Sequence, residues 1–283
     1  MSKFNICIVR PNGYIHSSAF IELAELICYS LIDNGMSAEI KENTISSSSV
    51  NIILGCHLLD LSMIDDIPKS SIIFNTEQFG QGSIEWQQKI RIFLESFSSW
   101  DYSSYNISLI KSSGIKPPIH FKIGFHEKLK RIPGDIKRKI DVLFYGVLTD
   151  ARLEILTQLE KKGIKVKKLV GVYGQERDFL ISRSNIILNL HAYPTKIFEI
   201  IRVHYLMNNA KAVLSQIDRD TKIDKEYMSG IAFAEYGNLV ERCAEILHSK
   251  AAILDLEECS LSALKNIDSK LIMSEMVENL LSK

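Results

Sequence analysis

The sequence predicts an α/β protein with two domains, each built on a parallel sheet. Short apolar runs rich in β-branched residues alternate with helical segments along most of the chain, as parallel strands and their crossover helices do. The alternation stops once, in a basic segment that contains prolines, and then starts again. The chain has 283 residues, of which 46% are hydrophobic, so two medium-sized domains can each bury a core.

The first half contains four predicted strands. FNICIVR (4–10) is a short buried strand, and residues 19–35 have apolar residues at helical spacing before a stop at Asn34-Gly35. Further strands are expected at 37–43, 49–55 and 70–79, and a helix at 83–97. We therefore assign residues 1–120 to an N-terminal domain.

A basic segment separates the halves. Residues 116–139, KPPIHFKIGFHEKLKRIPGDIKRK, hold three of the six prolines and eight Lys or Arg against two acids. We predict a linker at 121–139. Its charge fits either a solvated surface or a positive rim that attracts an anionic substrate.

The second half repeats the alternation. Strands are expected at 140–146, 164–171, 185–191 and 211–216, with an extended piece at 230–236, and helices at 151–163, 176–184, after residue 191 and near 238–250. We assign 140–262 to a C-terminal domain and 263–283 to a terminal helix, which either packs on the N-terminal half or forms a dimer face. Such sheets bind ligands beyond the carboxyl ends of their strands, so two facing halves predict a cleft between domains.

Composition excludes several function classes. The 34 basic and 34 acidic residues give a net charge of zero, which argues against nucleic acid as the partner. We find no apolar run of membrane-spanning length and no signal peptide, so we expect a cytoplasmic protein, for which peripheral membrane contact stays open. The five scattered cysteines lack CxxC spacing, so we expect reduced thiols and no metal site.

Two strand ends carry candidate ligand groups. Tyr145 and Gly146 end one strand, and Thr149 and Arg152 follow at a helix start; glycine allows close approach and a helix N-terminus suits a phosphate. Thr149 is equally a plain helix cap. A second candidate group follows the next strand and consists of Val172, Tyr173 and Gly174. This group fits either a nucleotide base lying against the chain or a turn with a packed tyrosine. Neither a dinucleotide fingerprint nor a P-loop occurs.

The third strand end is the stretch ILNLHAYPTKIFEIIRVHYL (187–206). His191 follows the strand, and Lys196 marks the expected helix start. Glu199 and Arg202 are three residues apart and share a helix face. They fit a surface ion pair, or a site in which the carboxylate accepts ribose hydroxyls and the guanidinium grips a diphosphate.

These stretches resemble a known family. The runs DVLFYGVLTDARLEILTQL and GVYGQERDFLISRSNIILNLHAYPTKIFEIIRVHYLMNNAKAVLS are similar to the C-terminal half of bacterial glycosyltransferases of the GT-B type, which have two Rossmann-like domains. IIFNTEQF and SSWDYSSYNISLIKSSGI resemble parts of their N-terminal half. The retaining members carry two glutamates eight positions apart. Here the positions eight before and eight after Glu199 are His191 and Met207, so the sequence does not support that paired-glutamate mechanism.

The resemblance implies sugar transfer from a nucleotide-activated donor, bound by the C-terminal half, to a hydroxyl of a glycan or lipid-linked glycan. It implies no cofactor and no metal. It places Tyr145, Gly146, Thr149 and Arg152 at the diphosphate, the 172–174 group at the base, and His191, Lys196, Glu199 and Arg202 at ribose and phosphates.

An inverting transfer needs a general base from the N-terminal half. The candidates are Glu77 at the end of the strand 70–79, His16 in the loop after the first strand, and Asp101 in WDYS. Asp101 is otherwise a helix cap. Asn12 and Gly13 would shape the loop beneath the acceptor.

Other functions stay open. A two-domain binding protein has the same plan, although the absent signal peptide argues against the periplasmic kind. A sugar-nucleotide epimerase would also bind the nucleotide. The basic segment permits a phage-type DNA glucosyltransferase. An inactive relative also stays open, because 283 residues is a compact length for two such domains. The oligomeric state is left undetermined.

Overall fold

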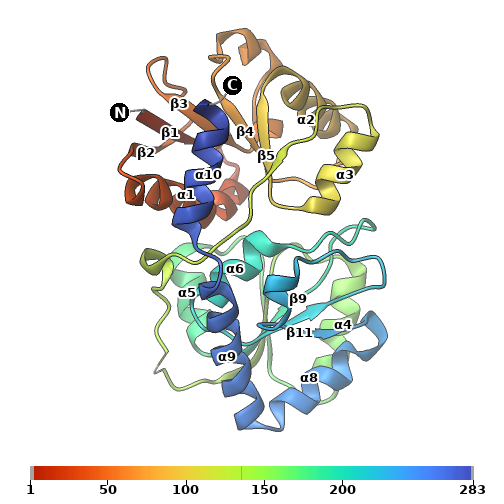
Figure 1. Cartoon of the computed structure of the whole chain (residues 1–283). Helices are drawn as coiled ribbons and strands as arrows, with labels where there is room; N and C mark the ends of the chain where they lie inside the picture. The colour runs from red at the N-terminus through yellow and green to blue at the C-terminus, as the bar shows by residue number, and fades with distance from the viewer. Residues whose placement is uncertain (1–2, 135, 282–283) are drawn as a thin grey trace. The chain divides into compact units, whose positions relative to one another are not determined.

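The computed structural model describes residues 3–134 and 136–281, which form two compact units. The chain passes from the first unit to the second between His126 and Glu127, and returns to the first between Ile267 and Asp268. Figure 1 shows one parallel sheet flanked by helices in each unit. The predicted α/β class with two Rossmann-like sheets is therefore confirmed.

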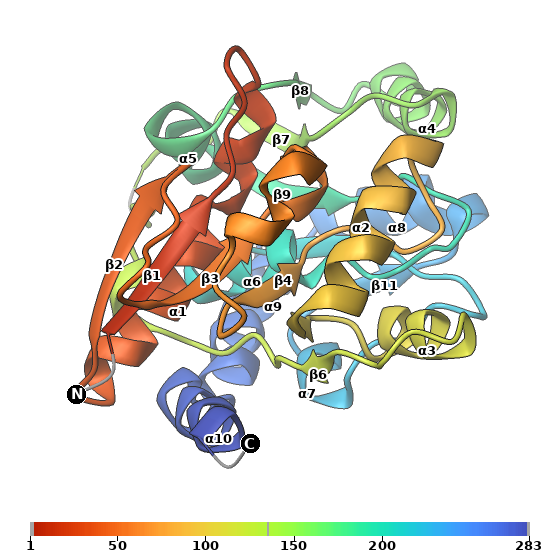
Figure 2. The ribbon, with the colours of Figure 1, turned by 90° about the horizontal axis from the view of Figure 1, so that it is seen from above.

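Unit 1 has a six-stranded sheet in the order β2-β1-β3-β4-β5-β6, and every pairing is parallel. Figure 2 shows β2, β1, β3 and β4 side by side. The strands are β1 (Lys3–Ile8), β2 (Ser37–Glu42), β3 (Val50–Leu54), β4 (Ile72–Asn75), β5 (Ser98–Asp101) and β6 (Ile119–His120). The helices are α1 (Ile21–Asp33), α2 (Ile84–Ser96), α3 (Ser104–Ser112) and α10 (Ser269–Leu281), with 3₁₀ turns η1 (Ile15–Phe20), η2 (Cys56–Leu58) and η3 (Leu61–Asp66).

Unit 2 has a five-stranded parallel sheet in the order β11-β10-β9-β7-β8. The strands are β7 (Ile140–Tyr145), β8 (Val166–Leu169), β9 (Ser184–Asn189), β10 (Val213–Gln216) and β11 (Ala232–Ala234). The helices are α4 (Asp150–Lys161), α5 (Gly174–Ser182), α6 (Ile200–Asn208), α7 (Lys225–Met228), α8 (Leu239–Leu247) and α9 (Lys250–Lys265), with 3₁₀ turns η4 (Glu127–Leu129) and η5 (Tyr236–Asn238). Its strand order reverses between β7 and β9, which is the switch point where such sheets bind ligands.

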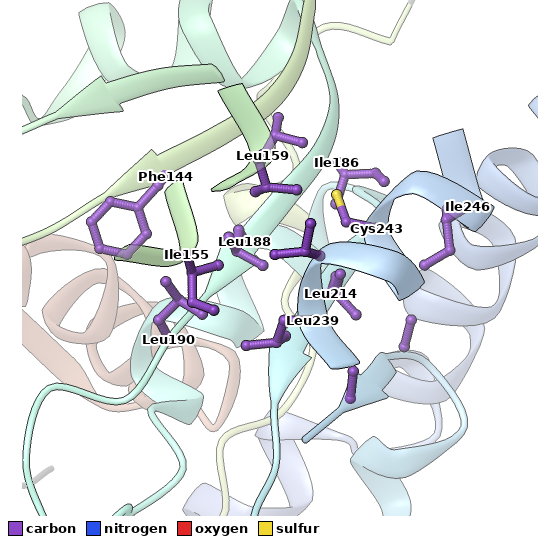
Figure 3. Packing of buried hydrophobic residues seen from close by; sticks show 14 of the residues in the cluster. Phe144, Ile155, Leu159, Ile186, Leu188, Leu190, Leu214, Leu239, Cys243 and Ile246 are labelled. Carbon is purple, nitrogen blue, oxygen red and sulfur yellow. The ribbon is translucent and has the colours of Figure 1, made fainter. Parts of the chain in front are cut away.

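Alternation along the strands builds the unit 2 core. Phe144, Leu188 and Leu214 point to one face, where they meet Ile155 of α4 and Leu239 of α8 (Figure 3). All of these side chains are almost fully buried. This apolar layer fixes α4 against β7, and so fixes the loop between them that carries several candidate site residues.

The C-terminal helix α10 belongs to unit 1, where it packs on α1. Asn34 donates from Nδ2 to the carbonyl of Lys270 at 2.9 Å, and Phe125 forms an isolated bridge with Asp268. Of the two expectations for the terminal helix, packing on the N-terminal half is the one observed.

One expectation about apolar stretches needs correction. The helical stretch Ile15–Asp33 has 19 residues and is long and apolar enough to cross a membrane. However, 56% of its most apolar window is buried inside the protein, as in a core helix.

Some elements differ from the prediction. The sequence did not indicate β5, β6 or α9: both strands are very short, and α9 leaves Leu254 50% exposed, which blurs its apolar face. The predicted linker 121–139 includes residues that pack into unit 2, because Leu129 and Ile132 are buried and Asn209 binds the amides of Arg131 and Ile132. Residue 135 lies outside the described residues.

Candidate functional site

The first candidate site lies at the switch point of unit 2. The parallel strands β7 and β9 are hydrogen-bonded neighbours, and β10 lies next to β9. The loops that leave these three strands therefore start from one edge of the sheet. They carry Gly146, His191 and Asp218, and α6 begins just beyond the second loop.

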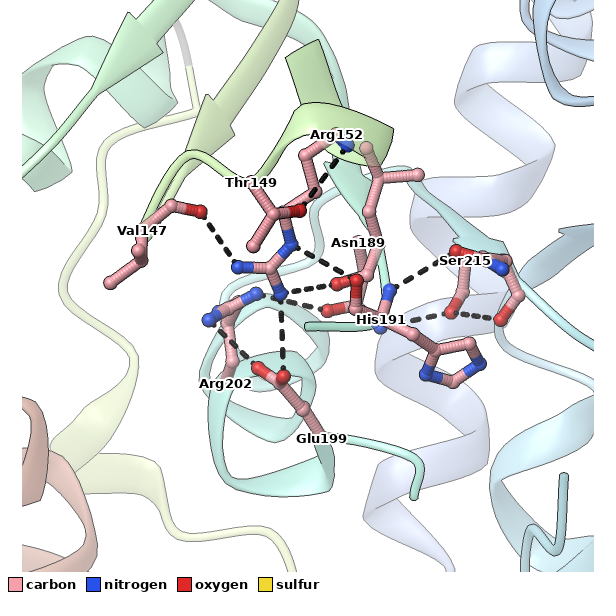
Figure 4. Close-up of polar contacts among 10 residues, drawn as sticks. Val147, Thr149, Arg152, Asn189, His191, Glu199, Arg202 and Ser215 are labelled. Carbon is pink, nitrogen blue, oxygen red and sulfur yellow. Dashed lines mark hydrogen bonds and ion pairs between the residues drawn. The ribbon is translucent and has the colours of Figure 1, made fainter. Parts of the chain in front are cut away.

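Glu199 lies between two guanidinium groups at this edge (Figure 4). Its Oε2 is 2.7 Å from Nη2 of Arg202, and its Oε1 is 3.4 Å from Nη2 of Arg152. The three side chains together carry one net positive charge. An anionic ligand group is therefore favoured here, while the carboxylate offers oxygens to hydroxyl donors.

Arg152 is mainly committed to the protein itself. It is 2% exposed and donates to the carbonyls of Val147, at 2.8 Å, and His191, at 3.2 Å, and to that of Leu190. Burial lowers the pKa of its guanidinium to about 10, partly opposed by Glu199, so the group stays charged at neutral pH. Arg152 thus ties the β7–α4 loop to the end of β9.

Arg202 is the more accessible of the two arginines, with 18% of its side chain exposed. Its Nη1 donates to Oδ1 of Asn189 at 3.3 Å, and its guanidinium lies over the ring of Tyr145, 5.5 Å from the centroid. A Cβ on Gly146 would come within 3.1 Å of its Nη2, and Gly146 has a φ of +136°. Gly146 therefore leaves the space in which Arg202 lies.

One of the two predicted helix starts is observed and the other is not. Thr149 caps α4, since its Oγ1 accepts the amide N–H of Arg152 at 3.4 Å, which is the plain capping role that the sequence also allowed. Lys196 does not begin a helix as predicted. It has a φ of +50°, and α6 starts at Ile200 with Glu199 as its N-cap residue. Pro194 and the left-handed Lys196 keep this loop from continuing a helix.

His191 belongs to a second polar group at the same edge. Its Nε2 is 3.4 Å from Oγ1 of Thr221 and 3.9 Å from Oδ2 of Asp218, and its Nδ1 is buried without a hydrogen-bond partner. Burial lowers the pKa of His191, against the opposing effect of Glu199 and Asp218. In Figure 4 its ring points away from Arg202. Lys196 reaches this group through Asp218, with Nζ 2.8 Å from Oδ1.

Sequence reasoning missed Gln216, Asp218 and Thr221. Gln216 receives the amide N–H of His191 at 3.2 Å and donates to Asp218 at 3.0 Å. All three end or follow β10. The rule that marked the ends of the other strands could therefore have found them.

The residues after β8 lie beside the first group. Val172, Tyr173 and Gly174 are partly buried, and Gly174 opens α5 with a φ of +61°. Burial raises the pKa of Tyr173, while Arg202 and Arg177 lower it. Tyr173 therefore lies within electrostatic reach of Arg202.

Unit 1 has its own polar edge, at the ends of β3, β4 and β5. Glu77 follows β4, and 24% of its side chain is exposed. Its Oε1 is 3.7 Å from Nε2 of His57, which sequence reasoning did not single out. His57 lies in η2 after β3 and is 2% exposed.

Asp101 is enclosed rather than presented to a ligand. It is fully buried, and it accepts from Asn75 at 2.7 Å, from Asn106 at 2.6 Å and from the amide of Ser103 at 2.8 Å. Burial raises the pKa of Asp101 to about 7, opposed by these hydrogen bonds. Asp101 is also not the cap of α3, because Ser103 has that role. This geometry favours the other two base candidates over Asp101.

The remaining candidates lie in the loop after β1. Asn12 and Gly13 are exposed, and Gly13 has a φ of +76°. His16 is partly buried in η1, with its ring 5.3 Å from that of Tyr14. Within the described residues, no group of three or more His, Cys, Asp or Glu side chains is placed to hold a metal ion.

Comparisons with known proteins identify the fold. No protein-family model matches the sequence. "Uncharacterized protein L140" of Acanthamoeba polyphaga mimivirus is 25% identical over 258 residues, which cover 84% of this chain and 81% of that protein. "Uncharacterized protein L137" of the same virus is 26% identical over 209 residues, which cover 71% of this chain and 28% of that protein.

Several solved glycosyltransferases share the structure over the whole chain. Anabaena Alr3699/HepE, solved with UDP and glucose, has a TM-score of 0.67 at 10% identity, covering 100% of both chains. An alpha-glucosyltransferase, solved with UDP and a 13-mer DNA, has a TM-score of 0.66 at 11% identity, covering 98% of this chain and 99% of that one. WaaG, a glycosyltransferase involved in lipopolysaccharide biosynthesis, has a TM-score of 0.60 at 12% identity. The chain therefore has the GT-B fold that its sequence resembled.

Proposed function

We propose that this protein is a glycosyltransferase that moves a sugar from a nucleoside-diphosphate donor to a hydroxyl group. The observation that carries the proposal is the Arg202–Glu199 pair beside Gly146, at the switch point of unit 2. Two solved structures with the same fold contain UDP, which supports a uridine nucleotide as the first donor class to test.

The proposed site divides the donor among its residues. Arg202, whose side chain is partly exposed, binds the diphosphate, and Glu199 accepts hydrogen bonds from the ribose hydroxyls. Tyr145 and Gly146 shape the phosphate side, and Arg152 holds that loop in place. The 172–174 group contacts the base. Because these groups are already paired in the protein, little reorganisation is needed when charge develops on the leaving diphosphate.

Metal independence is part of the proposal. The leaving diphosphate gains negative charge as the bond to the sugar breaks, and Arg202 with the N-terminal end of α6 offers positive charge to it. Lys196 and His191 add polar contacts near the phosphates. We expect donor binding to be the same with magnesium and with a chelator.

A glycan or lipid-linked glycan is the acceptor we propose, with the enzyme in the cytoplasm. The solved relative involved in lipopolysaccharide biosynthesis supports this class. DNA is the second candidate acceptor, because a solved alpha-glucosyltransferase with the same fold contains a 13-mer DNA. Two basic residues of the segment 116–139 are already engaged within unit 2, Arg131 with Tyr205 and Arg138 with Glu257, which weakens that candidate. A steep salt dependence of duplex DNA binding would favour it.

Calorimetric titration tests the donor site. The purified protein is titrated with UDP, GDP, CMP and dTDP, with magnesium and with a chelator, beside Glu199→Ala and Arg202→Ala. We expect one nucleotide to bind, and Arg202→Ala to weaken it by about tenfold to hundredfold, the effect of losing a hydrogen bond to a charged group. Arg242→Ala is the control, because Arg242 is an exposed arginine of the same unit. Equal binding by Arg202→Ala and the control would refute the assignment.

A further inference from the structure

Four buried polar side chains in unit 1 form a network that includes Glu77, whose carboxylate is partly exposed. Asn75, Asp101 and Asn106 are at most 1% exposed and His57 is 2% exposed, whereas 24% of the Glu77 side chain is exposed. Burying polar groups is costly unless they are hydrogen-bonded. So much polar burial around one accessible side chain is typical of a functional site rather than of a core.

The two asparagines hold the backbone of Glu77 on both sides. Its amide N–H donates to Oδ1 of Asn75 at 3.3 Å, and its carbonyl accepts from Nδ2 of Asn75 and Nδ2 of Asn106, each at 3.0 Å. Asp101 accepts from the same two amide nitrogens and so orients both asparagines. The position of Glu77 is therefore set by β4, β5 and α3 together.

His57 contacts the side chain of Glu77. The 3.7 Å between Nε2 and Oε1 is longer than a hydrogen bond, as catalytic contacts in ligand-free proteins often are. The imidazole packs on Trp86, with ring centroids 4.6 Å apart. Burial, with a smaller contribution from Lys89, lowers the pKa of His57 to about 4. His57 is therefore neutral at physiological pH and touches Glu77 as a dipole rather than as a cation.

We propose that Glu77 takes the proton of the acceptor hydroxyl and that His57 is its positioning residue, aiming the carboxylate through Nε2–H. This inference rests on the proposed glycosyl transfer. The hydroxyl oxygen bonds to the anomeric carbon, the bond from that carbon to the phosphate oxygen breaks, and its electron pair leaves with the nucleotide. The hydroxyl proton passes to Glu77. A neutral partner suits this role, because an imidazolium would hold the carboxylate in its charged form and oppose proton uptake.

The first test measures turnover and binding separately. UDP release from UDP-glucose and UDP-galactose, with alkyl glucosides as acceptors, is compared with UDP binding for Glu77→Gln, His57→Leu and His57→Gln. We expect Glu77→Gln to lower kcat by roughly 10²–10⁴-fold, the usual share of acid–base catalysis, and to leave UDP binding unchanged. His57→Leu should lower kcat, and His57→Gln, which keeps an N–H donor, should restore part of it. Glu95→Gln, an exposed glutamate of α2, is the control.

Two outcomes of the turnover test are distinguishable. Wild-type turnover in Glu77→Gln, or equal kcat in the two His57 variants, would overturn the inference and leave the donor site intact. Failure of the wild-type protein to bind any nucleotide would instead refute the proposed function.

The second test is independent of substrate. In protein with ¹⁵N-labelled histidine, NMR identifies the tautomer of His57, whose signal is assigned by its loss in His57→Gln. We expect a neutral ring with its proton on Nε2, perturbed by Glu77→Gln and not by Glu95→Gln. A proton on Nδ1, or a ring insensitive to Glu77→Gln, would overturn the positioning role even if no active substrate is found.

Discussion

At the residue scale, Arg152 and Arg202 carry the same charge in different surroundings. Arg152 is buried and satisfied by three backbone carbonyls, whereas Arg202, beside Glu199, keeps 18% of its side chain exposed. The resemblance to GT-B glycosyltransferases implied that both bind phosphates. The structure makes Arg152 a support of the loop and leaves Arg202 as the better ligand group, because only an accessible donor can exchange water for phosphate.

Replacement of Gly146 should show how closely Arg202 is placed. Gly146→Ala puts a methyl group 3.1 Å from Nη2 of Arg202 and strains a backbone with a φ of +136°. We expect nucleotide affinity to fall by about tenfold or more, the loss of one charged hydrogen bond. Gly163→Ala is the matched control, because Gly163 also has a positive φ but no atom within 4 Å of its added Cβ. Equal affinity in the two variants would contradict the close approach.

Buried histidines should make stability depend on pH. Burial lowers the pKa of His204 to about 4 from its usual 6.5, so the unfolded chain takes up this proton first. The free energy of unfolding is therefore unaffected by His204 above pH 6.5 and decreases as the pH falls toward 4, by up to about 3 kcal/mol. The lowered pKa of His57 changes stability in the same direction.

The variant His204→Leu should reduce this slope. Denaturant midpoints of wild type and variant are measured at pH 4.5 and pH 7, and the exposed His248→Leu is the control. An unchanged difference between the two pH values would mean that His204 does not titrate as its burial requires.

At the element scale, close helix packing supports the candidate site in unit 2. α6, which carries Arg202, packs on α9, and α9 also packs on α7. Gly230, just after α7, lies where these helices meet. A Cβ there would be 2.8 Å from Cε of Met207 and 2.9 Å from Cβ of Ala263. The glycine therefore sets how near α6 and α9 can lie.

Gly230→Ala should destabilise unit 2 by overpacking. The nearest atoms include Cα of Ser260 at 3.0 Å, and backbone cannot move aside as a side-chain end can. We expect a loss of about 1–3 kcal/mol in the free energy of unfolding, measured with urea. Gly237→Ala, where the added Cβ meets nothing within 4 Å, should be neutral. Equal effects would show that the packing at Gly230 relaxes freely.

At the scale of the whole molecule, the chain ends in the unit in which it began. α10 packs on α1 and completes unit 1 after the chain has built unit 2. Met273 of α10 is fully buried, whereas Leu271 of the same helix is 63% exposed. The stability of unit 1 therefore depends on residues that lie far along the sequence.

Met273→Ala should weaken unit 1 and spare unit 2. A buried Met→Ala substitution costs about 2–5 kcal/mol. Hydrogen exchange followed by mass spectrometry should show faster exchange in α1 and β1, with α4 and β7 unchanged. Leu271→Ala is the control and should leave both units protected. Faster exchange spread equally over both units would contradict the division.

The sequence alone determined the class of fold and much of the candidate site. Alternating apolar periodicity gave both sheets, since burial of strands and helix faces leaves a local pattern. The strand-end rule found Gly146, Glu199 and Arg202 at the unit 2 edge, because parallel strands place their carboxyl ends together.

The tertiary structure decided what distant residues do to each other. Asp101 is a buried support for Glu77, and His57 is a neighbour of Glu77, although the two lie 20 positions apart in the sequence. In the structure, α6 also starts at Ile200 rather than at the predicted Lys196, and α10 packs on α1. Burial and hydrogen-bond partners depend on contacts between elements, and local sequence patterns carry no record of those contacts.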